Sequence, residues 1–247
     1  MIRGIVSGIT AMRAQLLNQE VIANNLANAD TAAYNRDKVV FSSFNDALMY
    51  ALRPSAFPVA IGRMSSGAVV QDIETIRSVG PIEKTEEPLD IALPAGDYLS
   101  VETASGTRYT RRGDLEVSGD GYLTVAGYKV LGKSGPVNVT GYGSKAIRED
   151  GAVLGDGKAV DSLALVEFKD ESVLVKEGNS LFRPGSGEAT PALSVVLIQG
   201  ALEKSSVDPV SEMVNLIYTM RAYEAAQRAI RSHDETLEEA VNRVGKV

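Results

Sequence analysis

The sequence contains no cysteine and no tryptophan, has a single histidine, His233, and is only 6% aromatic. The absence of cysteine excludes disulfides, thiolate zinc sites and thiol nucleophiles. One histidine cannot form a metal site that needs several, and its place beside Asp234 near the end of the chain is typical of a surface or interface residue. These absences argue against an enzyme and against a resident metal ion.

The motifs of catalytic and ligand-binding sites are also missing. No serine lies in a Gly-x-Ser-x-Gly pattern, and no alternating aspartate loop of the calcium-binding type is present. Gly-Asp-Gly-Lys at 155–158 lacks the spacing of a phosphate-binding loop and predicts a hairpin turn. A Ser-His-Asp arrangement built from distant residues stays open, but we predict a protein without catalytic residues, cofactor or metal.

The chain has no long hydrophobic run. Nothing approaches the roughly 18 apolar residues that cross a bilayer, so we predict no membrane span. The N-terminal MIRGIVSGITAMRAQ has an apolar stretch too short for the core of a secretory signal, and it lacks a small-residue cleavage site. The protein is therefore expected either to stay in the cytoplasm or to leave it by a route that reads an uncleaved signal.

The 247 residues carry a net charge of −7, and no basic stripe stands out, which argues against a nucleic-acid partner. Hydrophobic residues make up 44% of the chain, which is enough for a substantial core. Disorder of the whole chain is therefore excluded.

Both ends of the chain have the heptad spacing of amphipathic helices. Over residues 4–29 the apolar seam and its companion set are Ile5, Ile9, Met12, Leu16, Ala23 and Leu26. Over residues 209–244 the seam is Leu216, Tyr223, Ile230, Leu237 and Val244, with a companion set at Met213, Met220 and Val241. Ser206-Val207-Asp208 before Pro209 predicts a capped helix start. A lone helix of this length is marginal in water, so we expect the two to pack together and leave further apolar faces for other copies.

The middle of the chain has β-type sequence. Residues 35–75 lack a clear period and predict an extended connector with short strands. Beyond them, short runs of strand formers alternate with turns at Gly119-Asp120-Gly121, Asp150-Gly151 and Gly155-Asp156-Gly157, a strong hairpin signal. The fold class predicted is mainly β with α-helical termini that pair as a coiled-coil-like core. The predicted divisions are an N-terminal helix, a connector, an antiparallel β domain and a C-terminal helix, at 1–34, 35–75, 76–205 and 206–247.

Three asparagines cluster near the end of the first predicted helix, at Asn24, Asn25 and Asn28. Asn24 and Asn28 are four residues apart, so their amides are expected on one helical face, where a polar ladder would fix register between copies. The alternative is that Asn28 and Asp30 only terminate the helix.

These residues resemble the signatures of bacterial flagellar rod and hook proteins. Residues 23–28, ANNLAN, followed by Thr31 and Tyr34, resemble the N-terminal signature of the family, and EMVNLIYTMRAYEAAQRAI at 212–230 resembles its C-terminal signature. PLDIALPAGDYLSVET at 88–103 and the stretch 109–139 resemble the β domain of rod proteins, and IQGALEKSSVDPVSEM at 198–213 resembles their lead-in to the last helix. Hook proteins carry a larger outer β domain, for which this chain has no room.

The resemblance implies a structural subunit of the basal-body rod, without enzymatic activity. It implies export through the flagellar type III apparatus without a cleaved signal, and assembly in the periplasm with other copies, neighbouring rod proteins and the membrane-ring and export-gate components. The length and the phrases EPLDIAL, GPVNV and SSVDPVSEM look most like the proximal rod subunit, with the distal rod protein next. The family's glycine before the signature aromatic is Ala33 here, which predicts a local strain if that residue has positive φ.

Two alternatives outside the family are an enzyme and an adhesin or coiled-coil binding module. The assembly interface that we predict combines both helical seams with the signature residues. Its members are Ile5, Ile9, Met12, Leu16, Asn24, Asn25, Leu26, Asn28, Thr31, Tyr34, Met213, Leu216, Met220, Arg221, Tyr223, Glu224, Ile230 and Leu237.

Overall fold

The structure, a computed structural model, describes residues 2–43, 47–53, 56–64, 67–185, 189–192 and 196–244. The chain forms two compact units, which are described separately below. The helical unit comprises Met1–Ala27, Asp37–Ile76 and Asp208–Val247, and the β unit comprises Asn28–Arg36 and Arg77–Val207.

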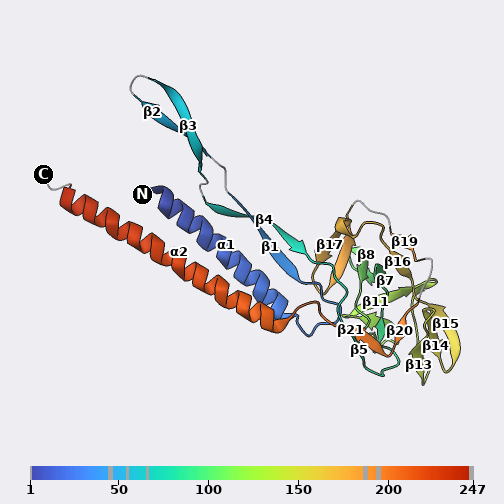
Figure 1. Cartoon of the computed structure of the whole chain (residues 1–247). Coiled ribbons are helices and arrows are strands. Elements are labelled where there is room, and N and C mark those ends of the chain that lie inside the picture. Colours follow the sequence, from blue (N-terminus) through green and yellow to red (C-terminus); the bar gives the residue numbers. More distant parts are fainter. Residues whose placement is uncertain are drawn as a thin grey trace. The chain divides into compact units, whose positions relative to one another are not determined.

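The helical unit is built on two long helices. Helix α1 (Ile2–Ala27) and helix α2 (Pro209–Val244) lie side by side and run antiparallel (Figure 1). This confirms the predicted pair of terminal helices. Helix α2 begins at the predicted cap, since the Asp208 carboxylate accepts hydrogen bonds from the Ser211 hydroxyl (2.6 Å) and the Val210 N–H (3.1 Å). These bonds hold the pKa of Asp208 below its usual value, because they favour the ionised form.

Four strands of seven to nine residues complete the helical unit. Strand β1 (Asp37–Ser43) pairs with β4 (Ala68–Thr75), and β2 (Ala47–Arg53) pairs with β3 (Ala56–Met64), both antiparallel. Helix α1 packs against β1 and β4 as well as against α2. It is therefore covered from two directions within its own unit.

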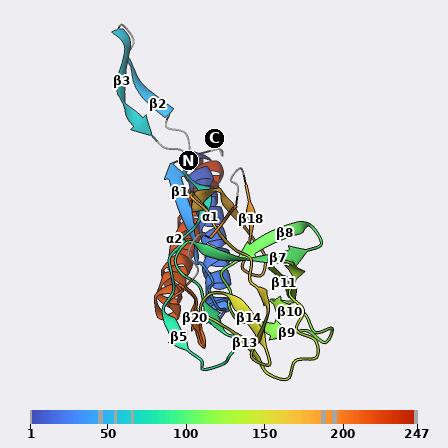
Figure 2. The ribbon, with the colours of Figure 1, turned by 90° about the vertical axis from the view of Figure 1, so that its right-hand side faces the viewer.

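The β unit is dominated by a ten-stranded sheet, part of which is seen in Figure 2. Its main path runs β17-β18-β8-β7-β11-β10-β9, with β12 on β11, β16 on β7 and β19 on β16. The strands are β7 (Asp97–Thr103), β8 (Gly106–Thr110), β9 (Glu116–Val117), β10 (Leu123–Val125), β11 (Tyr128–Gly132), β12 (Gly135–Pro136), β16 (Leu165–Glu167), β17 (Leu174–Glu177), β18 (Leu181–Pro184) and β19 (Thr190–Pro191).

Smaller sheets surround this one. Strands β13 (Lys145–Ile147), β14 (Ala152–Gly155) and β15 (Lys158–Ser162) form a meander. Strand β5 (Ile82–Lys84) pairs with β21 (Ala201–Glu203), and β6 (Ile91–Ala92) pairs with β20 (Ile198–Gln199). Every strand pair recorded in the structure is antiparallel, which confirms the predicted type of β domain.

The three predicted turn sequences all join paired strands. Gly119-Asp120-Gly121 lies between β9 and β10, Asp150-Gly151 between β13 and β14, and Gly155-Asp156-Gly157 between β14 and β15. The hairpin between β10 and β11 uses Ala126-Gly127 instead, with φ of 50° and 82°. Ala126 therefore adopts a left-handed backbone conformation, and no Asn-Gly or Asp-Gly pair marks this turn in the sequence.

The core of the β unit consists of aliphatic side chains from most of its strands. Its fully buried members are Ile91, Leu93, Leu99, Val101, Leu115, Leu123, Val125, Val130, Val137, Val139, Ile147, Val153, Leu163, Leu165, Leu181 and Leu197. A second cluster is aromatic, with the Tyr98 ring edge-on to Phe168 and Phe182 at centroid distances of 5.6 and 5.7 Å. Among the described residues, none from α1 or α2 belongs to either cluster, so the core of the β unit is formed by residues of that unit.

A buried ion pair joins distant segments of the β unit. Arg111 and Glu203 have side-chain exposures of 5% and 2%, and Arg111 Nη2 lies 2.7 Å from Glu203 Oε2. The other carboxylate oxygen of Glu203 accepts the Gly80 N–H at 2.9 Å. Arg111 Nη1 donates to the carbonyls of Pro94 and Asp97, both at 3.0 Å. Each charge is thus paired and hydrogen-bonded, which is the condition under which buried ions are tolerated.

Candidate assembly interface

The α1–α2 contact depends on two glycines of α1. A Cβ on Gly8 would lie 2.6 Å from Ile230 Cγ1, and a Cβ on Gly4 would lie 2.5 Å from His233 Nε2. Further along, Asn18 Nδ2 donates to Thr219 Oγ1 at 2.9 Å. The missing side chains let the helices approach closely at one end, and a side-chain hydrogen bond joins them at the other.

The predicted seam of α2 faces α1. Leu216, Tyr223, Ile230 and Leu237 are all half-buried, and they recur every seven residues as expected. The second stripe of the same contact is formed by Thr219, Ala226 and His233. The single histidine of the chain therefore packs at the helix pair.

The predicted companion positions are not part of this contact. Met213 and Met220 are 51% and 47% exposed, and Val241 is also exposed. On α1 the buried apolar side chains among the described residues are Ala14, Val21 and Ile22, whereas Ile9, Leu16 and Ala23 of the predicted seam are exposed. Ile5, Met12 and Leu26 are half-buried. Each helix has two apolar stripes, and a heptad repeat does not show which of them meets the partner helix within the chain. The role of these residues in assembly stays a prediction.

The asparagine with the strongest contacts is Asn25. It is 1% exposed, its Nδ2 donates to the Asp37 carbonyl at 2.8 Å, and its Oδ1 accepts the Asp37 N–H at 2.9 Å. The amide thus pairs with both backbone groups of one residue, as an antiparallel neighbouring strand would. Asp37 in turn accepts a hydrogen bond from the Thr75 hydroxyl at 2.7 Å. Asn25 therefore joins the last turn of α1 to the start of the β1–β4 pair.

The predicted ladder of Asn24 and Asn28 stays a prediction, and Asn28 lies just after α1, which ends at Ala27. Asn24 lies on the exposed side of α1. Asn28 begins the following turn, in which its Oδ1 accepts the Thr31 hydroxyl at 3.2 Å and its carbonyl accepts the Thr31 N–H at 3.1 Å. The alternative role of Asn28 at the end of the helix is therefore the one that the structure supports.

We expect Asn25→Asp to destabilise the helical unit by about 2–4 kcal/mol, because it removes a buried donor and places a carboxylate against the Asp37 carbonyl. Urea unfolding followed by circular dichroism at 222 nm measures the change. The control is Asn215→Asp on the exposed side of α2, for which we expect a change within about 0.5 kcal/mol. Equal effects of the two substitutions would contradict the proposed role of Asn25.

Tyr34, the signature aromatic, is buried inside the β unit. The Lys176 ammonium lies 3.9 Å from the centroid of its ring and donates to the Asn35 carbonyl at 2.6 Å. The Tyr34 carbonyl accepts the Ser206 N–H at 2.9 Å. Tyr34 thus ties residues 28–36 to β17 and to the segment before α2.

Ala33 has the positive φ anticipated for the family glycine position, 49°, and its N–H donates to the Glu203 carbonyl at 2.8 Å. We expect Ala33→Gly to stabilise the β unit by about 0.5–1 kcal/mol. The glycine relieves a left-handed alanine, and the entropy of the more flexible unfolded chain offsets part of the gain. Chemical unfolding measures this. Ala146→Gly in strand β13 is the control and should destabilise by about 0.5–1 kcal/mol; a loss of stability in both variants would refute the strain.

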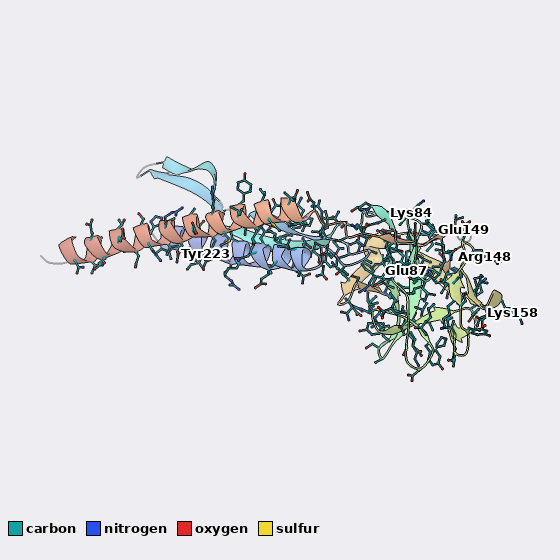
Figure 3. All side chains as sticks on the ribbon, turned by 90° about the horizontal axis from the view of Figure 1, so that it is seen from below. Lys84, Glu87, Arg148, Glu149, Lys158 and Tyr223 are labelled. Carbon is teal, nitrogen blue, oxygen red and sulfur yellow. The ribbon has the colours of Figure 1, made fainter. Side chains whose placement is uncertain are left out.

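Three residues of the C-terminal signature divide between two sides of α2. Tyr223, labelled in Figure 3, lies on the α1-facing seam and is half-buried. Arg221 and Glu224 are exposed, and Glu224 lies 3.9 Å from Arg228 one turn further on. An exposed pair of this kind contributes little stability. Arg221 and Glu224 therefore face away from the contact within the chain.

A second apolar stripe lies on α2, and the sequence analysis identified only two of its members, Met213 and Met220, although the spacing of the whole stripe is visible in the sequence. Its residues, which are all exposed, are Val210, Met213, Val214, Ile217, Tyr218 and Met220. Helix α1 has a shorter exposed set, Val6, Ile9 and Leu16. Beside Leu16, a groove of about 480 Å³ runs between α1 and β4, lined on its strand side by Ala68, Val69 and Val70. The helical unit thus presents apolar surface on several sides.

The surface of the β unit is of mixed charge. Figure 3 labels five of its exposed charged side chains, Lys84, Glu87, Arg148, Glu149 and Lys158. Within the described part of the chain, no three histidine or acidic side chains are arranged to hold a metal ion. None of the helices described there is long and apolar enough to cross a membrane.

Comparison with known proteins agrees with this geometry. The family described as flagella basal body rod protein matches residues 5–34, and the flagellar basal body rod FlgEFG protein C-terminal family matches residues 198–243. The chain is 31% identical to the flagellar basal-body rod protein FlgG of Bacillus subtilis (strain 168), over 98% of this chain and 99% of the relative. The chain belongs to the flagellar basal-body rod protein family.

Two further relatives of this rod protein span a similar length. It is 33% identical to the flagellar basal-body rod protein FlgF of Salmonella typhimurium (strain LT2), over 92% of this chain and 93% of the relative. It is 26% identical to the flagellar hook-basal body complex protein FlhO of Bacillus subtilis, over the whole of both chains. The family is structural, and the prediction that the chain is not an enzyme is confirmed. The family also argues against an adhesin or an unrelated coiled-coil module.

Proposed function

We propose that this rod protein is a subunit of the proximal rod and that it polymerises through its terminal helices into the periplasmic drive shaft. In this assembly α1 and α2 surround the export channel and the β unit lies outside them. Its partners are other copies of itself, the neighbouring proximal and distal rod proteins, the type III export apparatus that delivers it, and the membrane-ring and export-gate components at the base.

The observation that carries the proposal is the second apolar stripe of α2. The helix already buries one stripe against α1, yet Val210, Ile217 and Tyr218 remain exposed on another side. Covering one isoleucine contributes about 1.5–3 kcal/mol, and about 300 Å² of apolar area contributes about 7 kcal/mol at ~25 cal/mol per Å². A stripe of this size is costly to leave in water and is typical of a helix that packs among several others.

The surface of α1 supports the same assembly. Ile9 and Leu16 are exposed on the side where the groove against β4 opens. Arg13 and Glu20 line the same groove, so charges of opposite sign accompany its apolar surface. The exposed apolar stripe of a helix from a neighbouring copy is suited to cover this groove. The assembly interface thus combines exposed residues of both helices, and the role of the eighteen predicted residues in it stays a proposal.

Substitution of the stripe tests polymerisation. We expect Ile217→Lys to leave the thermal unfolding and helix content of the purified subunit unchanged, because the side chain is exposed in the single chain. The same variant should build no rods and give non-swimming cells, since each buried lysine charge would lack a partner. Ile217→Leu is the control and should swim normally. Motile cells carrying Ile217→Lys would overturn the proposal.

The assignment to the proximal rod is supported by the length and by EPLDIAL, GPVNV and SSVDPVSEM. The second candidate is the distal rod, because relatives named FlgG and FlgF match the chain at similar identity. A map of the intact basal body in which this chain carries a small tag distinguishes them. Density for the tag next to the membrane ring is the expected result, and density at the hook end would replace the proposal with the second candidate.

A further inference from the structure

A small pocket of the β unit is surrounded by polar side chains that the proposed polymerisation through the helices does not use. Its volume is about 160 Å³, and Asn35, Arg77, Tyr98 and Glu171 are among the residues that line it. Asn35 comes from the segment after α1, Tyr98 from β7 and Glu171 from the short helix before β17. Three distant parts of the sequence therefore converge on one cavity.

Two donors at this pocket lack a hydrogen-bond partner. Asn35 is 3% exposed, and among the residues that the structure describes no acceptor is within reach of its Nδ2 or of Arg77 Nε. Other hydrogen bonds hold both residues in place. The main-chain carbonyl of Asn35 accepts a hydrogen bond from the Lys176 ammonium, and Arg77 Nη2 donates to the Leu174 carbonyl at 2.6 Å. Leaving a buried donor unpaired costs about 1–3 kcal/mol. The arrangement therefore favours the arrival of an acceptor oxygen.

The remaining polar groups determine the charge of such a ligand. Arg111 also lines the pocket, but its charge is compensated by Glu203. Burial, together with the nearby Glu171 carboxylate, raises the pKa of Tyr98 to about 12, so its hydroxyl stays neutral. This leaves one positive side chain, Arg77, and one negative side chain, Glu171. A neutral group with an acceptor and a donor matches this set better than an anion or a cation.

The rim of the pocket indicates where the ligand comes from. Ser78, Val79 and Ala95 line the pocket and are exposed to solvent. Val79 is a large apolar side chain at this rim, beside the buried donors. An apolar mouth over a polar floor suits a protein side chain or a turn of backbone, which can bury carbon atoms at the mouth and pair an amide below.

We propose that this pocket receives an amide group, from an asparagine or glutamine side chain or from the main chain, of a neighbouring subunit in the assembled rod. The amide carbonyl accepts hydrogen bonds from Asn35 and Arg77, and its N–H donates to Glu171. The pocket is then a docking site on the β unit, in addition to the contacts of the helices. The inference rests on the proposed polymerisation.

The test uses the full chain, expressed together with the wild type so that both compete for places in the rod. Ala95→Leu narrows the mouth, and Asn35→Leu replaces the amide with its unpaired donor by an apolar side chain of similar size. We expect each variant to unfold at the wild-type temperature or above as a purified subunit. We expect each to be about tenfold under-represented in purified basal bodies, the factor that corresponds to about 1.4 kcal/mol.

The control is Ala104→Leu, an exposed alanine in the turn between β7 and β8, which should enter rods as often as the wild type. Equal incorporation of Ala95→Leu would overturn the docking site, as would a map of the rod that shows only water in the pocket. If Ile217→Lys is excluded from rods in the same assay while Ala95→Leu enters them, the docking site alone fails. If Ile217→Lys also enters freely, polymerisation through the helices fails as well.

Discussion

Replacing Arg111 with methionine is expected to destabilise the β unit by about 3–5 kcal/mol, the largest effect of any single substitution that we anticipate. The variant leaves the Glu203 carboxylate buried without its counter-charge. It also removes the donors to the Pro94 and Asp97 carbonyls, which lie on the far side of the guanidinium. Because the chain has no tryptophan, unfolding in urea is best followed by circular dichroism.

Two comparisons make this prediction sharp. The exposed pair of Lys204 and Glu83, with side-chain exposures of 60% and 57%, is the matched control, and Lys204→Met should cost less than about 1 kcal/mol. The double variant Arg111→Met with Glu203→Leu should be more stable than Arg111→Met alone, since it removes the uncompensated charge. If Arg111→Met unfolds at the same urea concentration as Lys204→Met, the buried pair contributes little to stability.

Removing residues 210–247 is expected to abolish motility while the β unit keeps its unfolding midpoint. The deletion removes the second apolar stripe and also uncovers the face of α1 that packs on Ile230 and His233. The core of the β unit has no member from either helix, so its cooperative unfolding should persist. Removing residues 1–27 should have the same outcome.

Circular dichroism of the two truncated proteins and a swimming assay with each as the only copy in the cell provide the measurements. Thermal unfolding should show one sheet-type transition near that of the full chain. A swimming cell with either truncated protein would refute the role of the helices. Loss of the sheet transition would instead show that the β unit depends on the helices for its stability.

The sequence predicted the helices well because a heptad repeat is a local signal. Leu216, Tyr223 and Ile230 face α1 as their spacing indicates. The companion positions Met213 and Met220 lie on an equally regular stripe on another side of α2, so their role in assembly stays a prediction. In the sequence, Gly8 marks the face of α1 that approaches α2 most closely, because only a residue without a side chain fits against Ile230.

The contacts of the candidate sites were less accessible to sequence reasoning. The Asp-Gly turns predicted three hairpins of the β unit. The order of strands in its large sheet also depends on pairings between distant segments, such as β7 with β16, and no local sequence pattern indicates these. Arg111 and Glu203 are separated by 92 positions, so their pairing leaves no spacing to recognise. The partners of Asn25 are the backbone N–H and carbonyl of Asp37, and they cannot be predicted from the sequence because every residue carries the same backbone groups.

The hydrogen bond between Asn18 and Thr219 spans 201 positions. Joining two points so far apart carries a loop-closure penalty, and it must wait until the ribosome has made nearly the whole chain. Until then α1 can pack against β1 and β4, but its partner helix α2 has not been synthesised. The face of α1 that meets α2 therefore stays exposed to water during most of translation, and the helix pair can form only after Thr219 has been synthesised.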